Sequence, residues 1–266
     1  MTQRADAIFH TARDALTRTG DTRVWSVIVT IFGDLAQDPR DQIPGNTLSE
    51  LTRMIGIKPE AMRVALHRLR KDGWINSEKS GRTSSHRLTR KGFEESLAAR
   101  PRIYATNSER PGQWHLLLRE AQTGAARGKA QARKLPGGYT MLLDRVFLGQ
   151  GRAAGDERGF VIDGGAGTVP PWVKDTVISE DCVRSYNLLY RDLQAVQAGL
   201  KEAPKLSELQ VAVLRILIVH NWRRCILRHA DLPDAFFPDG CPAVACRALV
   251  TQLLGRLGRP ALVELK

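Results

Sequence analysis

The stretch PEAMRVALHRLRKDG at residues 59–73 runs directly into WINSEKSGRTSSHRL at residues 74–88, and these two stretches decide the fold of the first part of the chain. The first has apolar residues at helical spacing. Pro59 suits its first turn, and Gly73 suits its end. The second reads as two short strands joined by a turn at Gly81. The sequence therefore predicts a helix followed by a hairpin.

The predicted helix separates apolar from basic residues. Its apolar residues fall on one face, and three basic residues at i, i+4 and i+7 share the opposite face, namely Arg63, His67 and Arg70. From Lys58 to Lys91 there are ten Lys or Arg against three acids, a local balance of +7 in 34 residues. A run of charge is often only a solvated surface, but this density points to a polyanionic partner.

Two further helices are predicted upstream. Residues 24–36 form a dense apolar run, and TLSELTRMIG at residues 47–56 has a helical stripe that Gly56 can end. Thr47 and Glu50 fit a capping box at the start of the second helix. Residues 1–22 show only weak helical periodicity, which predicts at most a short or frayed helix. The order helix, helix, glycine turn, basic helix and basic hairpin predicts a winged helix-turn-helix.

The third helix of such a unit can enter the major groove of DNA, because the groove is about as wide as a helix. Arg63 is the best candidate for reading bases, since guanidinium can bond guanine in bidentate fashion, and His67 is the second. The other cations suit phosphate contacts. The full set of predicted DNA-binding residues is Lys58, Arg63, His67, Arg70, Lys71, Lys79, Arg82 and Arg87.

The rest of the chain divides into a mixed part and a helical part. In the middle, a strand at 113–118, a basic helix at 121–135, strand material at 139–148 broken at Asp144-Arg145, and a strand near 160–162 predict a small antiparallel sheet. After residue 175 the pattern predicts helices at 179–200, 207–228 and 243–257, and the second of these has a nearly continuous apolar run. We expect the buried His220 to be a core or interface residue rather than a ligand.

Composition bounds the possible functions. The 266 residues have 42% hydrophobic content and a formal charge of +12, as expected of a globular protein with a polyanionic partner. No stretch reaches the ~18 apolar residues of a membrane span, and the N-terminus lacks a signal-peptide pattern, so we expect a cytoplasmic protein. The four cysteines match no zinc or redox motif and are expected to be reduced, mostly buried thiols. We expect no metal and no cofactor.

Two blocks of sequence resemble one known family. SVIVTIFGD at 26–34 with the basic stretch at 63–92, and HNWRRCILRHADLPDAFFP at 220–238, look like the N-terminal and C-terminal parts of the PaaX family, repressors of phenylacetic acid degradation operons. The resemblance implies an α+β protein with three parts: a winged helix-turn-helix at 23–100 after an N-terminal extension at 1–22, a central ferredoxin-like (Cas2-like) domain at 101–174, and a helical domain at 175–266.

The resemblance also implies a homodimer that binds an operator in double-stranded DNA and is released by an aryl-CoA or other acyl-CoA effector, phenylacetyl-CoA in the type member. The aromatic-rich segment usual after the central helix is reduced here to LPGGYTMLL, which bears on the ligand more than on the fold. Charged residues beside a strongly apolar helix need a partner, and Arg223 and Arg224 could meet an anionic group. The candidate ligand-binding residues are Trp114, Tyr139, Arg223 and Arg224.

Three alternative functions differ from this one in what they require of the sequence. A Cas2-like metal-dependent nuclease needs an Asp at the end of the first central strand, where this chain has Arg119-Glu120, so we predict that the protein is not an enzyme. Binding to a membrane surface requires exposed bulky apolar residues opposite the basic face, whereas the basic helix has only a small apolar face of Ala, Val and Leu, which the winged helix needs for its own core. A DNA-binding protein without a small-molecule switch is the nearest alternative, but the roughly 165 residues after the basic hairpin suggest dimerisation and sensing.

Overall fold

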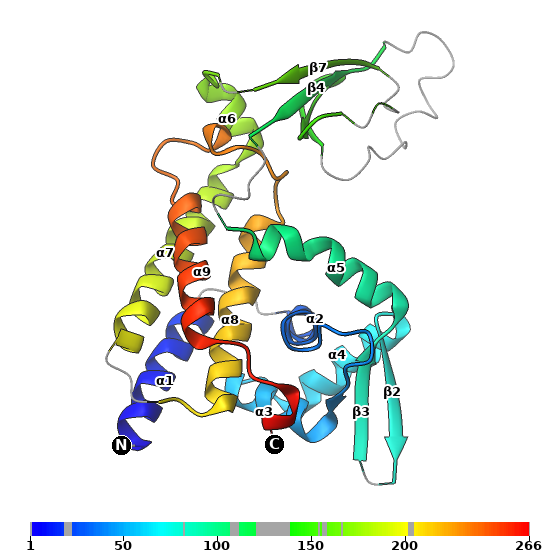
Figure 1. Cartoon of the computed structure of the whole chain (residues 1–266), viewed down its shortest axis with the longest axis vertical. Helices are drawn as coiled ribbons and strands as arrows, with labels where there is room; N and C mark the ends of the chain where they lie inside the picture. Colours follow the sequence, from blue (N-terminus) through cyan, green and yellow to red (C-terminus); the bar gives the residue numbers. More distant parts are fainter. Residues whose placement is uncertain are drawn as a thin grey trace. The chain divides into compact units, whose positions relative to one another are not determined.

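The computed structural model describes residues 2–18, 23–81, 83–106, 112–120, 139–153, 155, 159–165, 167–201 and 205–265. Figure 1 shows the course of the chain. The chain forms two compact units. Unit 1 consists of Met1–Tyr104, Leu188–Arg224 and Ala245–Lys266, and unit 2 of Ala105–Asn187 and Cys225–Val244. Helices and two small antiparallel sheets make the protein α+β, as predicted. The three-part division along the sequence stays a prediction.

Helix α1 (Thr2–Thr17) is longer and better packed than the sequence pattern indicated. One side of it is buried, with Phe9 and Leu16 each about 2% exposed. The side chain of Asn221 donates a hydrogen bond of 2.7 Å to the carbonyl of Leu16, and that of Gln210 donates one to Asp6. The prediction of a short or frayed helix was therefore wrong, because α1 is stabilised by residues some 200 positions away rather than by a strong pattern of its own.

Helix α2 (Val24–Leu35) confirms the first predicted helix and is almost entirely buried. It contains Asp34, whose carboxylate is fully buried and paired with Arg215 at 2.9 and 3.1 Å. The hydroxyl of Tyr104 donates a third hydrogen bond to Asp34. A buried charge is tolerated only when it is paired and hydrogen-bonded, and here both conditions are met. The network joins α2 to the C-terminal part of unit 1.

Helix α3 (Gly45–Ile55) ends at Gly56, which has the left-handed φ of 97° as predicted. The predicted capping box was wrong. The helix begins two residues before Thr47, and the Thr47 hydroxyl instead donates a hydrogen bond of 3.0 Å to the carbonyl of Leu265. Glu50 pairs with Arg53 rather than turning back to the helix start. A long-range bond to the C-terminal segment therefore replaced a local cap.

Helix α4 (Pro59–Lys71) and the hairpin of β2 (Ile75–Ser80) and β3 (Thr83–Leu88) lie where the sequence placed them. The strand β1 (Ile43–Pro44) pairs with β3, so the sheet order is β1-β3-β2 and all pairs are antiparallel. Gly73 has a positive φ of 72° where α4 turns into β2. Helix α5 (Arg90–Tyr104) follows the hairpin directly.

The helical part of the chain contains α7 (Glu180–Lys201), α8 (Glu208–Ile226) and α9 (Ala243–Leu257), all close to the predicted ranges. Most of α8 is buried, which explains the continuous apolar run in the sequence. The indole nitrogen of Trp222 donates a hydrogen bond of 2.9 Å to the carbonyl of Ile103, at the end of α5. Unit 1 thus packs its basic helix and hairpin against a helical core. The short η4 (Leu262–Glu264) follows α9.

Unit 2 contains a sheet of β4 (Trp114–Leu118), β5 (Thr140–Leu143), β6 (Val146–Gln150) and β7 (Phe160–Gly164), with α6 (Pro171–Val177) and η3 (Asp234–Phe236). The strand order β5-β6-β4-β7 is that of a ferredoxin-like sheet. All pairs in this sheet are antiparallel, which is also the pattern of a ferredoxin-like sheet, and the assignment as a ferredoxin-like (Cas2-like) domain stays a prediction. The two-residue turn at Asp144-Arg145 fixes the direction of β6 against β5. The predicted helix at 121–135 lies outside the described residues.

Candidate nucleic-acid interface

The exposed face of α4 is a direct consequence of its sequence. Ala65, Leu66 and Leu69 are buried. At about 100° per residue, the centre of the opposite side falls on Glu60, Val64, His67 and Lys71, with Arg63 and Arg70 together at one side of it. All six of these side chains are exposed. The helix therefore presents a mostly basic surface to solvent and keeps its apolar face for the core.

Arg63, the predicted base-reading residue, is exposed and already engaged. Its side chain is 69% exposed and forms an ion pair of 2.8 Å with Glu60, one turn before it on α4. An exposed pair of this kind contributes little to stability, so Arg63 can exchange it for another partner at small cost. Glu60 was not singled out by the sequence reasoning, although its spacing of three from Arg63 is the signal that would have found it.

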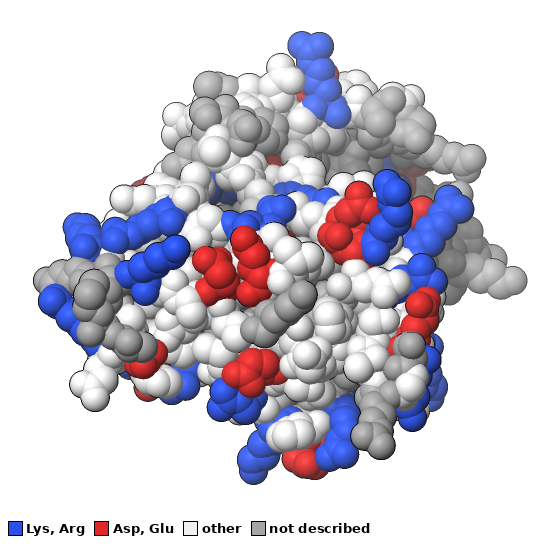
Figure 2. All heavy atoms as spheres, turned by 60° about the horizontal axis from the view of Figure 1, so that its bottom comes forward, with Lys and Arg blue, Asp and Glu red and all other residues white. Residues whose placement is uncertain are grey.

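Acidic side chains also lie near other cations of this surface and reduce its net positive charge. Figure 2 shows the Lys and Arg side chains at this end of the molecule interspersed with Asp and Glu rather than gathered in one patch. On the hairpin, Arg87 pairs with Glu78 at 2.9 Å. The side-chain ammonium groups of three predicted cations make no hydrogen bond or ion pair with any described residue, and these belong to Lys58, Lys71 and Lys79. They are the cations most available to a phosphate.

A chain of hydrogen bonds joins α4 to the hairpin. Arg70 donates a hydrogen bond of 3.2 Å to the hydroxyl of Ser77 on β2, and the same hydroxyl lies 2.8 Å from the Nδ1 of His86 on β3. Burial, and secondly the charge of Arg70, lowers the pKa of His86. A neutral His86 accepts or donates one hydrogen bond here without adding charge. Arg70 is thus held against the sheet, while Arg82 lies outside the described residues.

Sequence reasoning missed two features of this surface. Val64 is 70% exposed in the middle of the basic face of α4. Arg68 lies over the ring of Trp25 at 5.0 Å from its centroid, and it is 3.5 Å from Asp72. No local pattern marks the Trp25 contact, because α2 and α4 are separated by more than 20 residues. Val64 could have been found by placing every residue of α4 on its helical wheel.

The candidate ligand residues fall into both units. In unit 2, the indole nitrogen of Trp114 donates a hydrogen bond of 2.7 Å to the carbonyl of Gly165, and the indole ring contacts the ring of Phe236 edge-on. The Tyr139 hydroxyl lies 2.7 Å from the Nε2 of His115. Both aromatic residues therefore have structural partners. Arg223 and Arg224 belong to unit 1, so the four candidates are divided between the two units.

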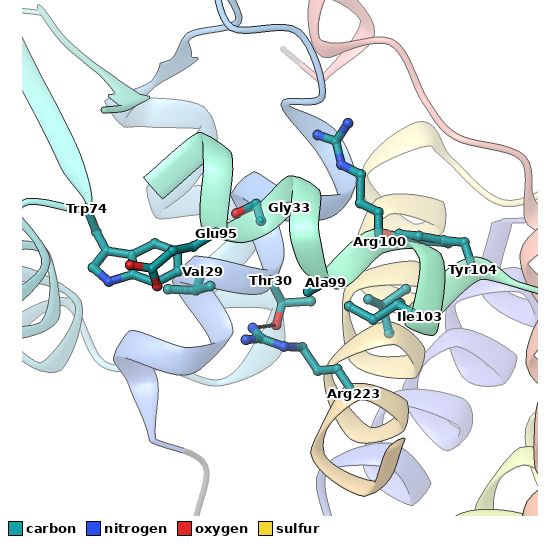
Figure 3. A pocket seen from close by; sticks show the side chains of 12 residues that line it. Val29, Thr30, Gly33, Trp74, Glu95, Ala99, Arg100, Ile103, Tyr104 and Arg223 are labelled. Atoms are coloured by element: carbon teal, nitrogen blue, oxygen red, sulfur yellow. Dashed lines mark hydrogen bonds between the residues drawn. The ribbon is translucent and has the colours of Figure 1, made fainter. Parts of the chain in front are cut away.

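Arg223 lines a cavity of unit 1 between α2, α5 and α8 (Figure 3). One of its nitrogens, Nη1, donates hydrogen bonds of 3.0 Å to the Thr30 hydroxyl and 3.3 Å to the Ser26 carbonyl. No carboxylate of a described residue pairs with it, and burial lowers its pKa. The cavity volume is about 40 Å³, room for roughly three water molecules. An acyl-CoA does not fit in this space unless the helices move.

His220 is buried, as predicted. Its Nδ1 lies 3.3 Å from the Thr30 hydroxyl, while its Nε2 has no partner among the described residues. Burial, reinforced by the charges of Arg223 and Arg224, lowers the pKa of His220 to about 3. The imidazole is therefore neutral near pH 7. In contrast to Arg223, the side chain of Arg224 is exposed.

Other kinds of site find little support. Within the described ranges, His, Cys, Asp and Glu side chains form no group of three able to hold a metal ion. The four cysteines form no disulfide, and Cys182, Cys225 and Cys246 are buried as expected. Across the same part of the chain, no helix combines the length and apolar character that crossing a membrane requires.

The fold and the exposed basic helix define an α+β protein with a candidate surface for a polyanion, and comparison with known proteins gives the family. A family model described as PaaX-like protein matches residues 23–92, and one described as PaaX-like protein C-terminal domain matches residues 179–263. The two segments together take in more than half of the chain and include α4, the hairpin and α8. The chain belongs to the PaaX family.

Individual relatives agree with this assignment. The chain is 23% identical over 258 residues to the Transcriptional repressor PaaX of Escherichia coli (strain K12), an alignment that covers 89% of this chain and 81% of that protein. Among solved structures, the Uncharacterized protein Rv0674 from Mycobacterium tuberculosis matches with a TM-score of 0.52 and 18% identity, covering 87% of this chain and 94% of that one. This second likeness concerns the fold alone. The family and its named relative are regulators rather than enzymes.

Proposed function

We propose that the protein is a cytoplasmic, homodimeric transcriptional repressor that binds double-stranded DNA. The observation that carries the proposal is the exposed basic face of α4, which lies beside an exposed hairpin in the same unit. The E. coli relative named as a transcriptional repressor supports it. In this proposal α3, α4 and the β2–β3 hairpin act as a winged helix-turn-helix, with α4 in the major groove and the hairpin as the wing.

The roles of the residues follow from their partners. Arg63 gives up its ion pair with Glu60 and bonds a guanine, and His67 contacts the adjacent base. Lys58, Lys71 and Lys79, which have no described partner, neutralise phosphates together with Arg82 and Arg87. Arg70 is tied to Ser77 and orients α4 against the wing. A dimer would place two such helices about one helical turn of DNA apart on a pseudo-palindrome.

We also propose that the repressor is regulated by an effector, the CoA thioester of an aromatic acid. This part of the proposal follows from the family resemblance. Arg223 supports it, because a half-buried guanidinium without a described carboxylate partner can receive an anionic group. Since the cavity beside it is small, effector binding requires α5 to move away from α2 and α8. That movement would reach the wing directly, because α5 begins two residues after β3 ends. The regulated operon would be one of phenylacetate-type catabolism.

The test is fluorescence-anisotropy binding to labelled duplex from the upstream region of the protein's own gene, at fixed salt, with and without a panel of CoA thioesters that includes phenylacetyl-CoA. Tight, sequence-selective binding that one thioester releases supports both parts of the proposal. Arg223→Gln should remove that release, while the matched change Arg224→Gln on the exposed neighbour should keep it. Weak binding that is equal for all sequences would contradict the repressor function.

The second candidate function is a DNA-binding protein without a small-molecule switch. The observation in its favour is the small volume of the cavity at Arg223, about 40 Å³. Under this alternative Arg223 serves only to hold α8 to α2 through Thr30. Tight, selective DNA binding that every thioester of the panel leaves unchanged would favour it over the regulated repressor.

A further inference from the structure

Val64 is the one large apolar side chain on the exposed face of α4. Its side chain is 70% exposed, about as much as that of Arg63. On the helical wheel it lies between Lys71 and Arg68, nearer to the centre of the face than Arg63 itself. A partner that covers the centre of this face therefore also meets the methyl groups of Val64.

Local stability does not explain a valine at this position. Valine is a poorer helix former than alanine, because its branched side chain loses rotamer freedom against the preceding turn. Its methyl groups also remain in water, so burial gives it no compensating gain. Single exposed apolar residues are common on protein surfaces, but this one lies in the middle of the surface proposed to meet DNA.

The neighbours of Val64 on α4 leave its surface accessible. Glu60, one turn earlier, is held in the ion pair with Arg63. Arg68, one turn later, is turned aside over Trp25 and toward Asp72. Two charged side chains that could cover the methyl groups are thus engaged elsewhere. What remains is a small apolar spot bordered by cations.

In the major groove of DNA, the matching apolar group is the C5-methyl of thymine, which distinguishes thymine from every other base on that edge. We propose that Val64 contacts a thymine methyl next to the base read by Arg63, and so makes an A·T pair part of the recognised sequence. The inference rests on the proposed DNA binding by α4 and adds one specific base to it.

The experiment first identifies the preferred duplex, by selecting tight binders from a random-sequence library with the full-length protein. Each thymine of that duplex is then replaced in turn by deoxyuracil, which removes only the methyl and keeps every hydrogen-bonding group. We expect one thymine per half-site at which the change weakens binding about fourfold, the factor that corresponds to one buried methyl-sized group. Thymines elsewhere should show no such effect.

Variants assign the effect to the side chain. Val64→Ala should bind the thymine and deoxyuracil duplexes equally at that position, and Val64→Ile should restore the preference. Leu97→Ala, which shortens another exposed apolar side chain on α5, is the matched control and should behave as the unmodified protein. Because alanine is the better helix former at an exposed site, Val64→Ala should fold normally.

The outcomes separate this inference from the function on which it rests. A selected sequence whose thymines all tolerate deoxyuracil would overturn the Val64 contact and leave DNA binding by α4 standing. A methyl effect that persists in Val64→Ala would also overturn it. A selection that yields no preferred sequence would overturn both the contact and the proposed function.

Discussion

Two helices of unit 1, α4 and α8, combine apolar residues with arginines and use them in opposite ways. In α4 the cations alternate with apolar residues at helical spacing, so they emerge on one exposed face. In α8 the apolar residues are nearly continuous, so Arg215 is only 4% exposed and needs the buried carboxylate of Asp34. The comparison teaches that the period of the apolar residues, rather than the number of cations, decides whether a basic helix can meet DNA or serves the core.

The largest effect should come from breaking the buried pair on α8. Arg215→Met leaves Asp34 buried without its partner, and we expect the free energy of unfolding to fall by about 3–5 kcal/mol. The double variant Arg215→Met/Asp34→Leu should recover much of the loss, since an apolar pair carries no desolvation penalty. Urea unfolding followed by circular dichroism measures both. Arg40→Met, at a fully solvated side chain, is the control; equal losses in the two single variants would contradict a special role for Arg215.

Stability should also depend on pH through His220. Its folded pKa, about 3, lies below the ordinary 6.5, so the unfolded state takes up the proton first as the pH falls. The stabilisation is complete above pH 6.5 and is lost as the pH falls toward 3, by up to about 1.4 kcal/mol per pH unit. His220→Gln should flatten this dependence between pH 6.5 and 4.5, whereas His10→Gln should not. Urea unfolding at several pH values measures it, and parallel curves for all three proteins would rule the explanation out.

On α4 the expected effect is on specificity rather than stability. Arg63→Ala should cost about 1–3 kcal/mol at one base pair of the selected duplex and relax the preference there. Arg53→Ala provides a matched control, because Arg53 also forms an ion pair with a glutamate three positions before it, Glu50 on α3. Anisotropy with duplexes altered one base pair at a time reports the result. If the preference at every position survives Arg63→Ala, another side chain reads that base.

The smallest effect should belong to the phosphate contacts. Lys71→Ala removes a cation with no described partner, so binding should weaken alike for all sequences. The slope of log affinity against log salt should become less steep by about 0.9, the share of one phosphate. Lys201→Ala on α7 should leave the slope unchanged. A change in sequence preference in Lys71→Ala would place this residue among the base-reading side chains instead.

The sequence predicted the features of this fold that depend on neighbouring residues. The ranges of α2, α4 and α8, the stops at Gly56 and Gly73 and the hairpin were foreseen, because periodicity and glycine are local signals. The assignments that failed depend on distant partners. Thr47 bonds the carbonyl of Leu265 rather than its own helix, and α1 is stabilised by Asn221 and Gln210.

The candidate site divides in the same way. The exposed face of α4 was predicted because a helix fixes which side chains share a side. The contact of Arg68 with Trp25 and the fixing of Arg70 by Ser77 were not, since they depend on how α4 packs on α2 and on the sheet. The ligand residues were guessed from residue type, and the structure divides them between two units.

The most direct test of the account is the ratio of affinities for the selected duplex and a scrambled duplex of equal length, at one salt concentration. The unmodified protein should prefer the selected duplex on the order of a thousandfold or more. The variant Arg63→Ala/Val64→Ala/His67→Ala should keep the fold and its affinity for the scrambled duplex, while the ratio falls to near one. A folded triple variant that keeps the full ratio would contradict the claim that α4 reads the sequence.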